Sequence, residues 1–199
     1  MAGEIVRYTA RDGIEVELTP EKVVGLIATG GNEPNPRDVA IFMAKCQARG
    51  LNPLAGDCYM TTYKNRRTGK VNTSVVVSKD YYMRTAYVQP TYKGFQAGIV
   101  VVNNGQVMYR PGSMLIDGEQ LIGGWADVYD ERLENPVHAE VARSEYDTEQ
   151  SLWADKPATM CRKVALVQAL REAYPGVYAG IYDSSEIPQT QIEVEAEVE

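Results

Sequence analysis

The stretch Tyr92–Arg110, YKGFQAGIVVVNNGQVMYR, decides the fold class. Two runs rich in β-branched and aromatic residues flank Asn103-Asn104-Gly105, and Asn and Gly accept the positive φ angles of a tight hairpin turn. The stretch therefore predicts two antiparallel strands joined by that turn.

More strands are expected on both sides of this hairpin. Cys58–Tyr63 and Val71–Val77 lie upstream, and Leu121–Tyr129 and Val137–Tyr146 follow the turn at Asp117-Gly118. Each run is rich in strand-forming residues and is bounded by turn residues. Together they predict an antiparallel sheet of about five strands with hairpins.

Helices are expected around the strands, because several segments carry start and stop signals. One helix starts at Thr19-Pro20 and ends at Gly30, and Ser78 can cap a short one. Another starts at Asn35-Pro36, where Asp38 would complete a capping box, and ends at Gly50. The last starts at Pro157 and ends at Tyr174. The helix that starts at Asn35-Pro36 should bury Val39, Phe42, Met43 and Cys46. The predicted class is α+β.

Length and composition predict one domain with one core. The 199 residues are 44% hydrophobic, which is enough for a single core over residues 1–183. Residues 1–18 alternate weakly and are expected to form an edge strand or a partly ordered arm. Residues 184–199 carry five glutamates and no base, so we expect a disordered acidic tail.

Several functional classes find no support in the sequence. No run of about 18 uncharged apolar residues exists, which predicts a cytoplasmic protein. Cys46, Cys58 and Cys161 form no close pair along the chain, and His138 is the only histidine, so neither a zinc site nor a catalytic triad is expected. No phosphate-binding glycine motif appears. We therefore expect no metal, no cofactor, no catalytic residues and no use of ATP.

The distribution of charge favours a polyanionic partner, although the formal net charge is -7. Between residues 60 and 112 the only acidic residue is Asp80, and the acidic excess lies in the flanks. The segment has eight basic residues: Lys64, Arg66, Arg67, Lys70, Lys79, Arg84, Lys93 and Arg110.

Aromatic residues accompany these bases. Seven of the thirteen tyrosines lie between Tyr59 and Arg110. Cations hold phosphates and rings stack on unpaired bases, so the mixture favours sequence-independent binding of single strands. About half of these tyrosines are expected only to pack in the sheet. Tyr82, between Lys79 and Arg84, is taken as a base contact.

The last helix supplies further candidates. Projected at about 100° per residue, Met160, Val164, Leu166, Val167, Leu170 and Tyr174 form one apolar face that contains Lys163 and Arg171. Arg162 points the other way, among Ala158, Ala165, Ala169 and Glu172. Cations within an apolar stripe either extend along it to solvent or meet an anionic ligand.

A metal-dependent nuclease is the enzymatic alternative. Asp127, Asp130, Glu131 and Glu134 could bind a metal, but they lack the carboxylate pair and following Glu-x-Lys step of many nucleases. A solvated hairpin end is the preferred interpretation of these four acids.

Two blocks of the sequence carry a resemblance to a known family. The first consists of Arg49-Gly50-Leu51-Asn52-Pro53-Leu54 and Asp57-Cys58-Tyr59. It is similar to the signature that follows the second helix in the RecT/Bet family of phage single-strand annealing recombinases. A more specific block contains Trp153, Pro157, Met160–Ala165, Gln168–Pro175 and Gly180-Ile181-Tyr182. The resemblance covers about residues 38–186, with a weaker likeness at residues 123–129.

The resemblance implies a helix-supported antiparallel sheet and ATP-independent annealing of complementary strands in phage recombination. Expected partners are single-stranded DNA, the annealed duplex intermediate, further copies in a ring or helical filament, a phage exonuclease and the host single-strand binding protein. By this likeness Lys163 and Arg171 contact the DNA backbone in a basic groove and Arg162 lies beside them. The hairpin bases Lys64, Arg66, Arg67 and Lys70 would grip a strand or an adjacent subunit.

Two departures and two further alternatives accompany this reading. Ala158-Thr159 stands where a close relative would place a base, and the acidic tail stands where family members often have a partner-binding domain. A single-strand binding protein that does not anneal would share every basic and aromatic feature. An oligomeric structural protein would use the tyrosines for protein contacts only.

Overall fold

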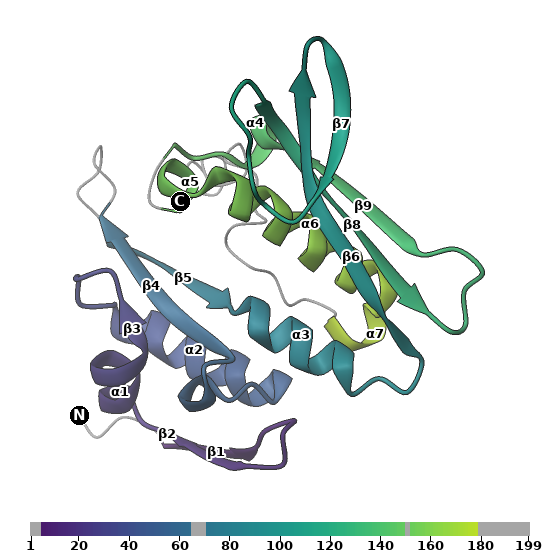
Figure 1. Ribbon diagram of the computed structural model, residues 1–199. Coiled ribbons are helices and arrows are strands. Elements are labelled where there is room, and N and C mark those ends of the chain that lie inside the picture. Colours follow the sequence, from purple (N-terminus) through teal and green to yellow (C-terminus); the bar gives the residue numbers. More distant parts are fainter. Residues whose placement is uncertain (1–4, 65–70, 150–151, 179–199) are drawn as a thin grey trace. The chain divides into compact units, whose positions relative to one another are not determined.

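The computed structural model describes residues 5–64, 71–149 and 152–178 (Figure 1). Two compact units make up the chain, residues 1–81 and residues 82–199. The residues expected to form one domain, 1–183, therefore belong to two units, each with buried side chains of its own. The acidic tail, residues 184–199, lies outside the described residues.

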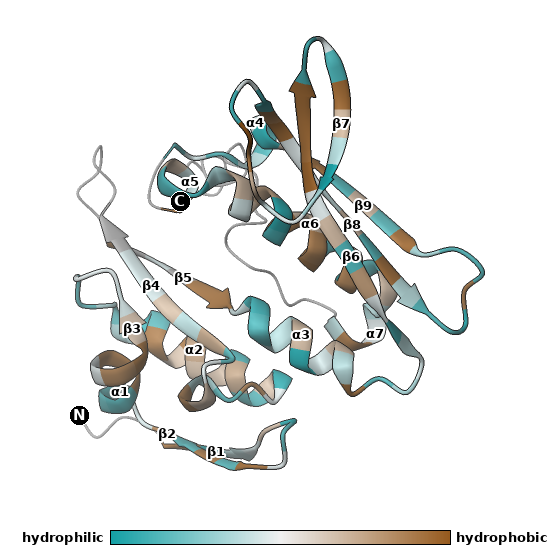
Figure 2. Ribbon diagram, viewed as in Figure 1, coloured by the Kyte–Doolittle hydropathy of each residue, from teal (hydrophilic) through white to brown (hydrophobic). Residues whose placement is uncertain are grey.

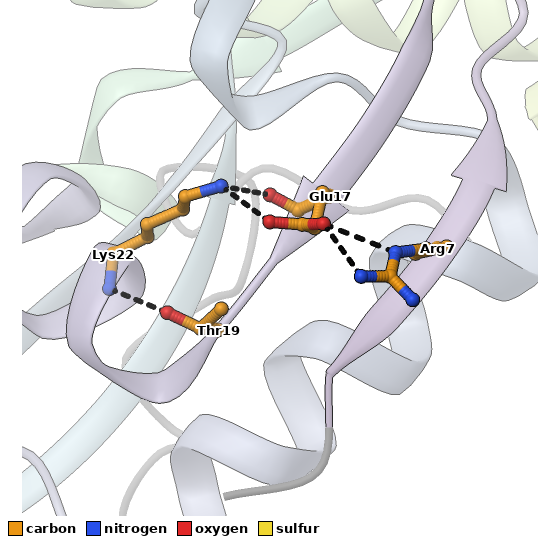
Figure 3. Close-up of polar contacts among 4 residues, drawn as sticks. All are labelled: Arg7, Glu17, Thr19 and Lys22. Atoms are coloured by element: carbon orange, nitrogen blue, oxygen red, sulfur yellow. Dashed lines mark hydrogen bonds and ion pairs between the residues drawn. The ribbon is translucent and has the colours of Figure 1, made fainter.

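The first unit begins with a two-stranded antiparallel hairpin, β1 (Val6–Thr9) and β2 (Glu15–Leu18). Arg7 and Glu17 are cross-strand partners, and Arg7 Nη2 lies 2.9 Å from Glu17 Oε2. Lys22 Nζ lies 3.0 Å from the other carboxylate oxygen (Figure 3). These two cations hold the pKa of Glu17 below its usual value. Of the two expectations for residues 1–18, the strand is the one observed.

The first predicted helix forms, and it begins where expected. Thr19 caps α1 (Pro20–Lys22) by accepting a hydrogen bond from the Lys22 backbone N–H. The helix continues as a π-helical segment, Val23–Ile27, which ends in β3 (Ala28–Thr29). Its apolar residues do not all pack inward, because Val23 and Ile27 are buried whereas Leu26 is 74% exposed.

The second predicted helix is α2 (Pro36–Arg49), and its predicted buried face is confirmed. Asn35 caps it by accepting a hydrogen bond from the Arg37 N–H. The predicted capping box is not formed by Asp38, whose carboxylate instead accepts a hydrogen bond of 2.7 Å from Thr73. Gly50 ends the helix in the left-handed conformation, with φ 61°.

The helix α2 accompanies a three-stranded sheet in the order β3-β4-β5, in which β4 (Cys58–Lys64) and β5 (Val71–Val77) are antiparallel. A short 3-10 helix, Pro53–Ala55, precedes β4. Cys46 and Cys58, remote in sequence, are both buried with their Sγ atoms 3.6 Å apart. The contact with Cys46, followed by burial, raises the pKa of the Cys58 thiol far above its usual range. The Cys58 thiol is therefore a packed, protonated core group.

The helix α3 (Lys79–Tyr87) is the predicted short helix after Ser78. Ser78 Oγ accepts a hydrogen bond of 3.1 Å from the Tyr81 N–H, as its capping role requires.

The second unit contains a four-stranded antiparallel sheet in the order β7-β6-β8-β9. The hairpin predicted over Tyr92–Arg110 is observed as β6 (Tyr92–Asn103) and β7 (Gln106–Pro111). Asn104 and Gly105 in its turn have φ angles of 50° and 76°. The remaining strands are β8 (Gln120–Asp130) and β9 (Val137–Ala142). A register shift interrupts the pairing of β6 with β8 between Val100 and Val101.

The strand predicted over Val137–Tyr146 is too long. After Ala142 the chain turns into a short helix, α4 (Arg143–Tyr146), in which Arg143 pairs with Asp147 at 2.7 Å. Tyr146 is buried, and its hydroxyl accepts a hydrogen bond from Gln168. Tertiary packing of Tyr146 thus outweighs its strand propensity.

The predicted last helix is α6 (Pro157–Ala173), preceded by α5 (Leu152–Asp155) and followed by α7 (Pro175–Tyr178). It packs on β6, β8 and β9. Gly124 on β8 allows this close approach, since a Cβ there would lie 2.4 Å from the Cys161 carbonyl oxygen. The helix ends where the sequence predicted, and Pro175 begins the separate short helix α7.

The α+β class is confirmed, with antiparallel strands supported by helices. The strands expected in one sheet are divided, because Cys58–Val77 belongs to the three-stranded sheet and the strands from Tyr92 onward form the four-stranded one.

Candidate nucleic-acid interface

The basic hairpin is formed by β4 and β5, whose register pairs Lys64 with Val71. Lys64 is the last residue of β4, and only its backbone belongs to the described part of the chain. Arg66, Arg67 and Lys70 lie outside the described residues. The strands that would present a basic tip are therefore present, and the DNA contacts of the tip remain a prediction.

The helix α3 carries three of the predicted contacts, and one of them is buried. Arg84 is exposed and Lys79 is partly exposed. Tyr82 has no exposed surface, and its ring packs on Tyr178 at 5.1 Å between centroids. Its backbone carbonyl also accepts a hydrogen bond of 2.6 Å from the Tyr178 hydroxyl. A buried ring offers no face to a base, so the prediction for Tyr82 is wrong.

Lys93, near the start of β6, is exposed and forms an ion pair of 3.2 Å with Glu131. Both side chains are more than half exposed, so the pair is weak and exchangeable. A phosphate can replace this carboxylate without leaving a buried charge behind.

Arg162 lies on the side of α6 next to β6. Its Nε donates a hydrogen bond of 3.3 Å to the carbonyl of Ala97. Its guanidinium carbon lies 5.9 Å from the centre of the Phe95 ring. Arg162 is thus held in place by the sheet while part of its surface is exposed.

Lys163 and Arg171 are also partly exposed, and each makes contacts within the protein. The sequence predicted one apolar face, but the alanines assigned to the opposite face are buried too. The helix is therefore enclosed on more sides than its pattern indicated. Lys163 and Arg171 lie where this enclosure is incomplete. The DNA-binding groove expected around them remains a prediction.

Sequence reasoning missed a tyrosine–arginine cluster at the ends of β6 and β8, formed by Tyr87, Tyr92, Asp130, Arg132 and Tyr174. Ring centroids are 5.2 Å apart for Tyr87 and Tyr92, and 6.4 Å apart for Tyr92 and Tyr174. The Arg132 guanidinium carbon lies 5.8 Å from the Tyr174 ring centre. Tyr87 is 65% exposed and leaves part of its ring to solvent.

Asp130 anchors this cluster, so the prediction that it belongs to a solvated hairpin end is wrong. Its side chain is buried and accepts two hydrogen bonds from the Arg132 guanidinium, at 2.8 and 2.9 Å. Thr91 donates a third, at 2.7 Å. Arg132, followed by Thr91, holds the pKa of Asp130 well below its usual range. The Asp130 carboxylate is thereby committed to the fold.

A second polar cluster was also missed, on the sheet face opposite α6. His138 Nδ1 lies 2.6 Å from Asp127, and its Nε2 lies 3.0 Å from Glu140. Glu140 also accepts a hydrogen bond of 2.7 Å from Tyr109. Cross-strand register brings these residues together, a signal that appears only once β8 and β9 are aligned.

The motif Gly50–Leu54, which carries part of the family resemblance, has a structural role. The Asn52 N–H donates to Asp57 at 2.7 Å, and the Asn52 side-chain carbonyl accepts from the Ala55 N–H at 3.1 Å. Its amide also donates to Asp12 at 3.2 Å. Asn52 therefore joins the end of α2, the start of β4 and the β1–β2 hairpin.

Comparison with known proteins identifies the family. A sequence model described as the RecT family matches residues 27–199, most of the chain. The chain belongs to the RecT family. The match includes the motif around Asn52, the whole four-stranded sheet and α6. Many residues that carry the likeness, such as Trp153, Cys161 and Leu170, are buried, so the family signature largely describes a core.

One curated relative is an uncharacterized protein, UU154, from Ureaplasma parvum serovar 3. The two sequences are 32% identical over 126 residues, which is 63% of this chain. The aligned region spans 49% of the relative, so the chain covers about half of its length.

Two kinds of feature are absent from the described residues. None of these helices is long and apolar enough to cross a membrane. Nor do three or more His, Cys, Asp or Glu side chains gather there in a way that could hold a metal ion.

Proposed function

We propose that this protein binds single-stranded DNA and anneals it to a complementary strand without ATP, as part of phage recombination in the bacterial cytoplasm. Membership of the RecT family is the observation that carries the proposal. The concentration of bases between residues 60 and 112 supports it, as do the partly exposed cations of α6.

The proposed DNA contacts, in each of the two units, are the basic residues predicted from the sequence; the buried Tyr82 is excluded. These are Lys64, Arg66, Arg67, Lys70, Lys79, Arg84, Lys93, Arg162, Lys163 and Arg171. Contacts to phosphates leave the bases of the bound strand free to pair. In a ring or filament of copies, an ordered strand would present its bases to a second strand. Pairing itself would then supply the specificity.

The test mixes two complementary oligonucleotides, one with a fluorophore and one with a quencher, with the protein and no nucleotide. Quenching should be faster than without protein, and it should be absent for a non-complementary control. Binding without faster quenching would show a protein that only coats single strands. Cleavage of labelled DNA in magnesium would identify a nuclease instead.

A further inference from the structure

The strand β7 is an uncovered edge of the four-stranded sheet. Among the described residues it pairs only with β6, so one side of its backbone has no neighbouring strand. Figure 2 shows hydrophobic colour on β7. Val107 is 58% exposed and Tyr109 is 51% exposed. An exposed edge with apolar side chains is a ready template for another strand.

The register identifies which backbone groups of β7 are available. A two-residue turn joins Asn103 to Gln106, so that pair is hydrogen-bonded and the pairs then alternate. Val107 and Tyr109 fall in non-hydrogen-bonded pairs, and their N–H groups point away from β6. Their side chains share one face of the sheet, while Met108 and Arg110 lie on the other.

The C-terminal segment of the chain has a complementary pattern. Residues 191–199, QIEVEAEVE, alternate apolar and acidic residues with the period of a strand. As a strand, the segment would present Ile192, Val194, Ala196 and Val198 on one side and glutamates on the other. Against β7 its apolar row would adjoin Val107 and Tyr109, and its acidic row would lie on the face of Met108 and Arg110, where the Arg110 guanidinium already pairs with Glu119 at 2.8 Å.

The length of chain between these parts allows the pairing. The Tyr92 ring lies 6.4 Å from the Tyr174 ring, which is one helical turn before Tyr178. At about 3.4 Å per residue, β6 extends about 20 Å from Tyr92 to Gly98. Gly98 is the cross-strand partner of Pro111. The twelve residues 179–190 span up to about 40 Å when extended.

We infer that residues 191–199 add to the free edge of β7 as an antiparallel fifth strand. A segment arriving from the α7 end meets Pro111 first and then runs toward Gln106, opposite to the direction of β7. This pairing covers the apolar edge of the sheet at Val107 and Tyr109. It is independent of the proposed DNA annealing, which uses other residues.

The test measures amide hydrogen exchange in the full chain. A double variant, V194P with A196P, removes two backbone donors and the extended pairing. The matched control is Q189P, which adds a proline before the alternating segment. In the double variant the Val107 and Tyr109 amides should exchange at least about tenfold faster. The control should resemble the parent, and β9 amides should be unaffected in all three proteins.

The outcomes separate the occupants of the edge. Equal exchange at Val107 and Tyr109 in all three proteins would overturn the inference. If the Val107 and Tyr109 amides stay protected in the proline variants but lose protection on dilution, the inference is also overturned, because a second copy of the chain then occupies the edge. Protection lost through the prolines supports it, and repeating the measurement at tenfold lower concentration shows whether the segment comes from the same chain.

Discussion

Tyr109 on β7 donates a hydrogen bond of 2.7 Å to Glu140 on β9, although β6 and β8 lie between these strands. In a flat sheet the outer two of four strands are about 14 Å apart, so both long side chains must lie across the sheet face toward each other. The register shift between Val100 and Val101 favours this approach, because a bulge bends its strand and increases the twist. The Tyr109 ring also packs edge-on against Trp125.

This relationship predicts a pH effect through His138, the only histidine. Asp127, followed by Glu140, raises the pKa of His138 above its usual value near 6.5. A group whose pKa is higher in the folded state stabilises the fold when it is protonated. This stabilisation is fully present below the unfolded-state pKa and is lost as the pH rises through the folded-state pKa. The Tm should therefore fall between about pH 6.5 and the folded pKa.

Nuclear magnetic resonance can follow the single imidazole directly. The His138 ring should titrate above about 6.5, and D127N should move its pKa down more than E140Q. The variant H138Q should lack this component of the pH dependence of Tm. A ring pKa at or below the ordinary value would contradict the prediction.

The ion pair of Asp130 with Arg132 predicts an opposite pH effect. The folded-state pKa of Asp130 is lowered, so the stability that it provides is present above the unfolded pKa and is lost as pH falls. The variant R132M should lower Tm by several degrees at neutral pH, because the buried carboxylate loses its paired cation and keeps its hydrogen bonds from Thr91 and from the backbone N–H of residue 132. Thermal denaturation between pH 2 and pH 7 is the measurement.

The control for that experiment is R7A, which removes an exposed cation paired with Glu17. Its Tm should change little, since exposed pairs contribute little stability. A similar loss of Tm in both variants would indicate a general charge effect and contradict a specific role for Arg132.

The close contact at Gly124 predicts a packing defect. A Cβ there meets the Cys161 carbonyl oxygen at 2.4 Å, so G124A should force α6 away from β8. Overpacking of this kind costs about 1–3 kcal/mol of unfolding free energy. Urea denaturation followed by fluorescence measures it, because Trp125 and Trp153 are both buried in the second unit.

The matched variant is G176A, in the same unit. A Cβ at Gly176 has no atom within 4 Å, so its unfolding free energy should stay within about 1 kcal/mol of the parent. Equal effects of the two alanines would show that α6 does not need the glycine.

Phosphate contact by α6 is tested with K163A and R171A. Each should weaken binding to single strands of different sequence by a similar factor of about 3–10, roughly 1 kcal/mol. Each should also reduce the slope of log affinity against log salt by about 0.7. The variant R7A removes the same charge outside the proposed surface and should bind like the parent. Unchanged binding by K163A and R171A would remove both residues from the surface.

Local signals in the sequence predicted much of the fold. Asn35 and Ser78 cap their helices, and Asn103-Asn104-Gly105 turns its hairpin, because caps and tight turns depend on neighbouring residues alone. The motifs around Asn52 and along α6 predicted the RecT family, which the family comparison confirmed.

Only the tertiary structure decided the contacts between remote segments. It buried Tyr82 under Tyr178, joined Asp130 to Thr91, and ended the strand at Ala142 so that Tyr146 could pack. Side-chain burial and charge pairing depend on which segments meet. A local pattern of apolar and charged residues does not contain that information, because the partner lies tens of residues away along the chain.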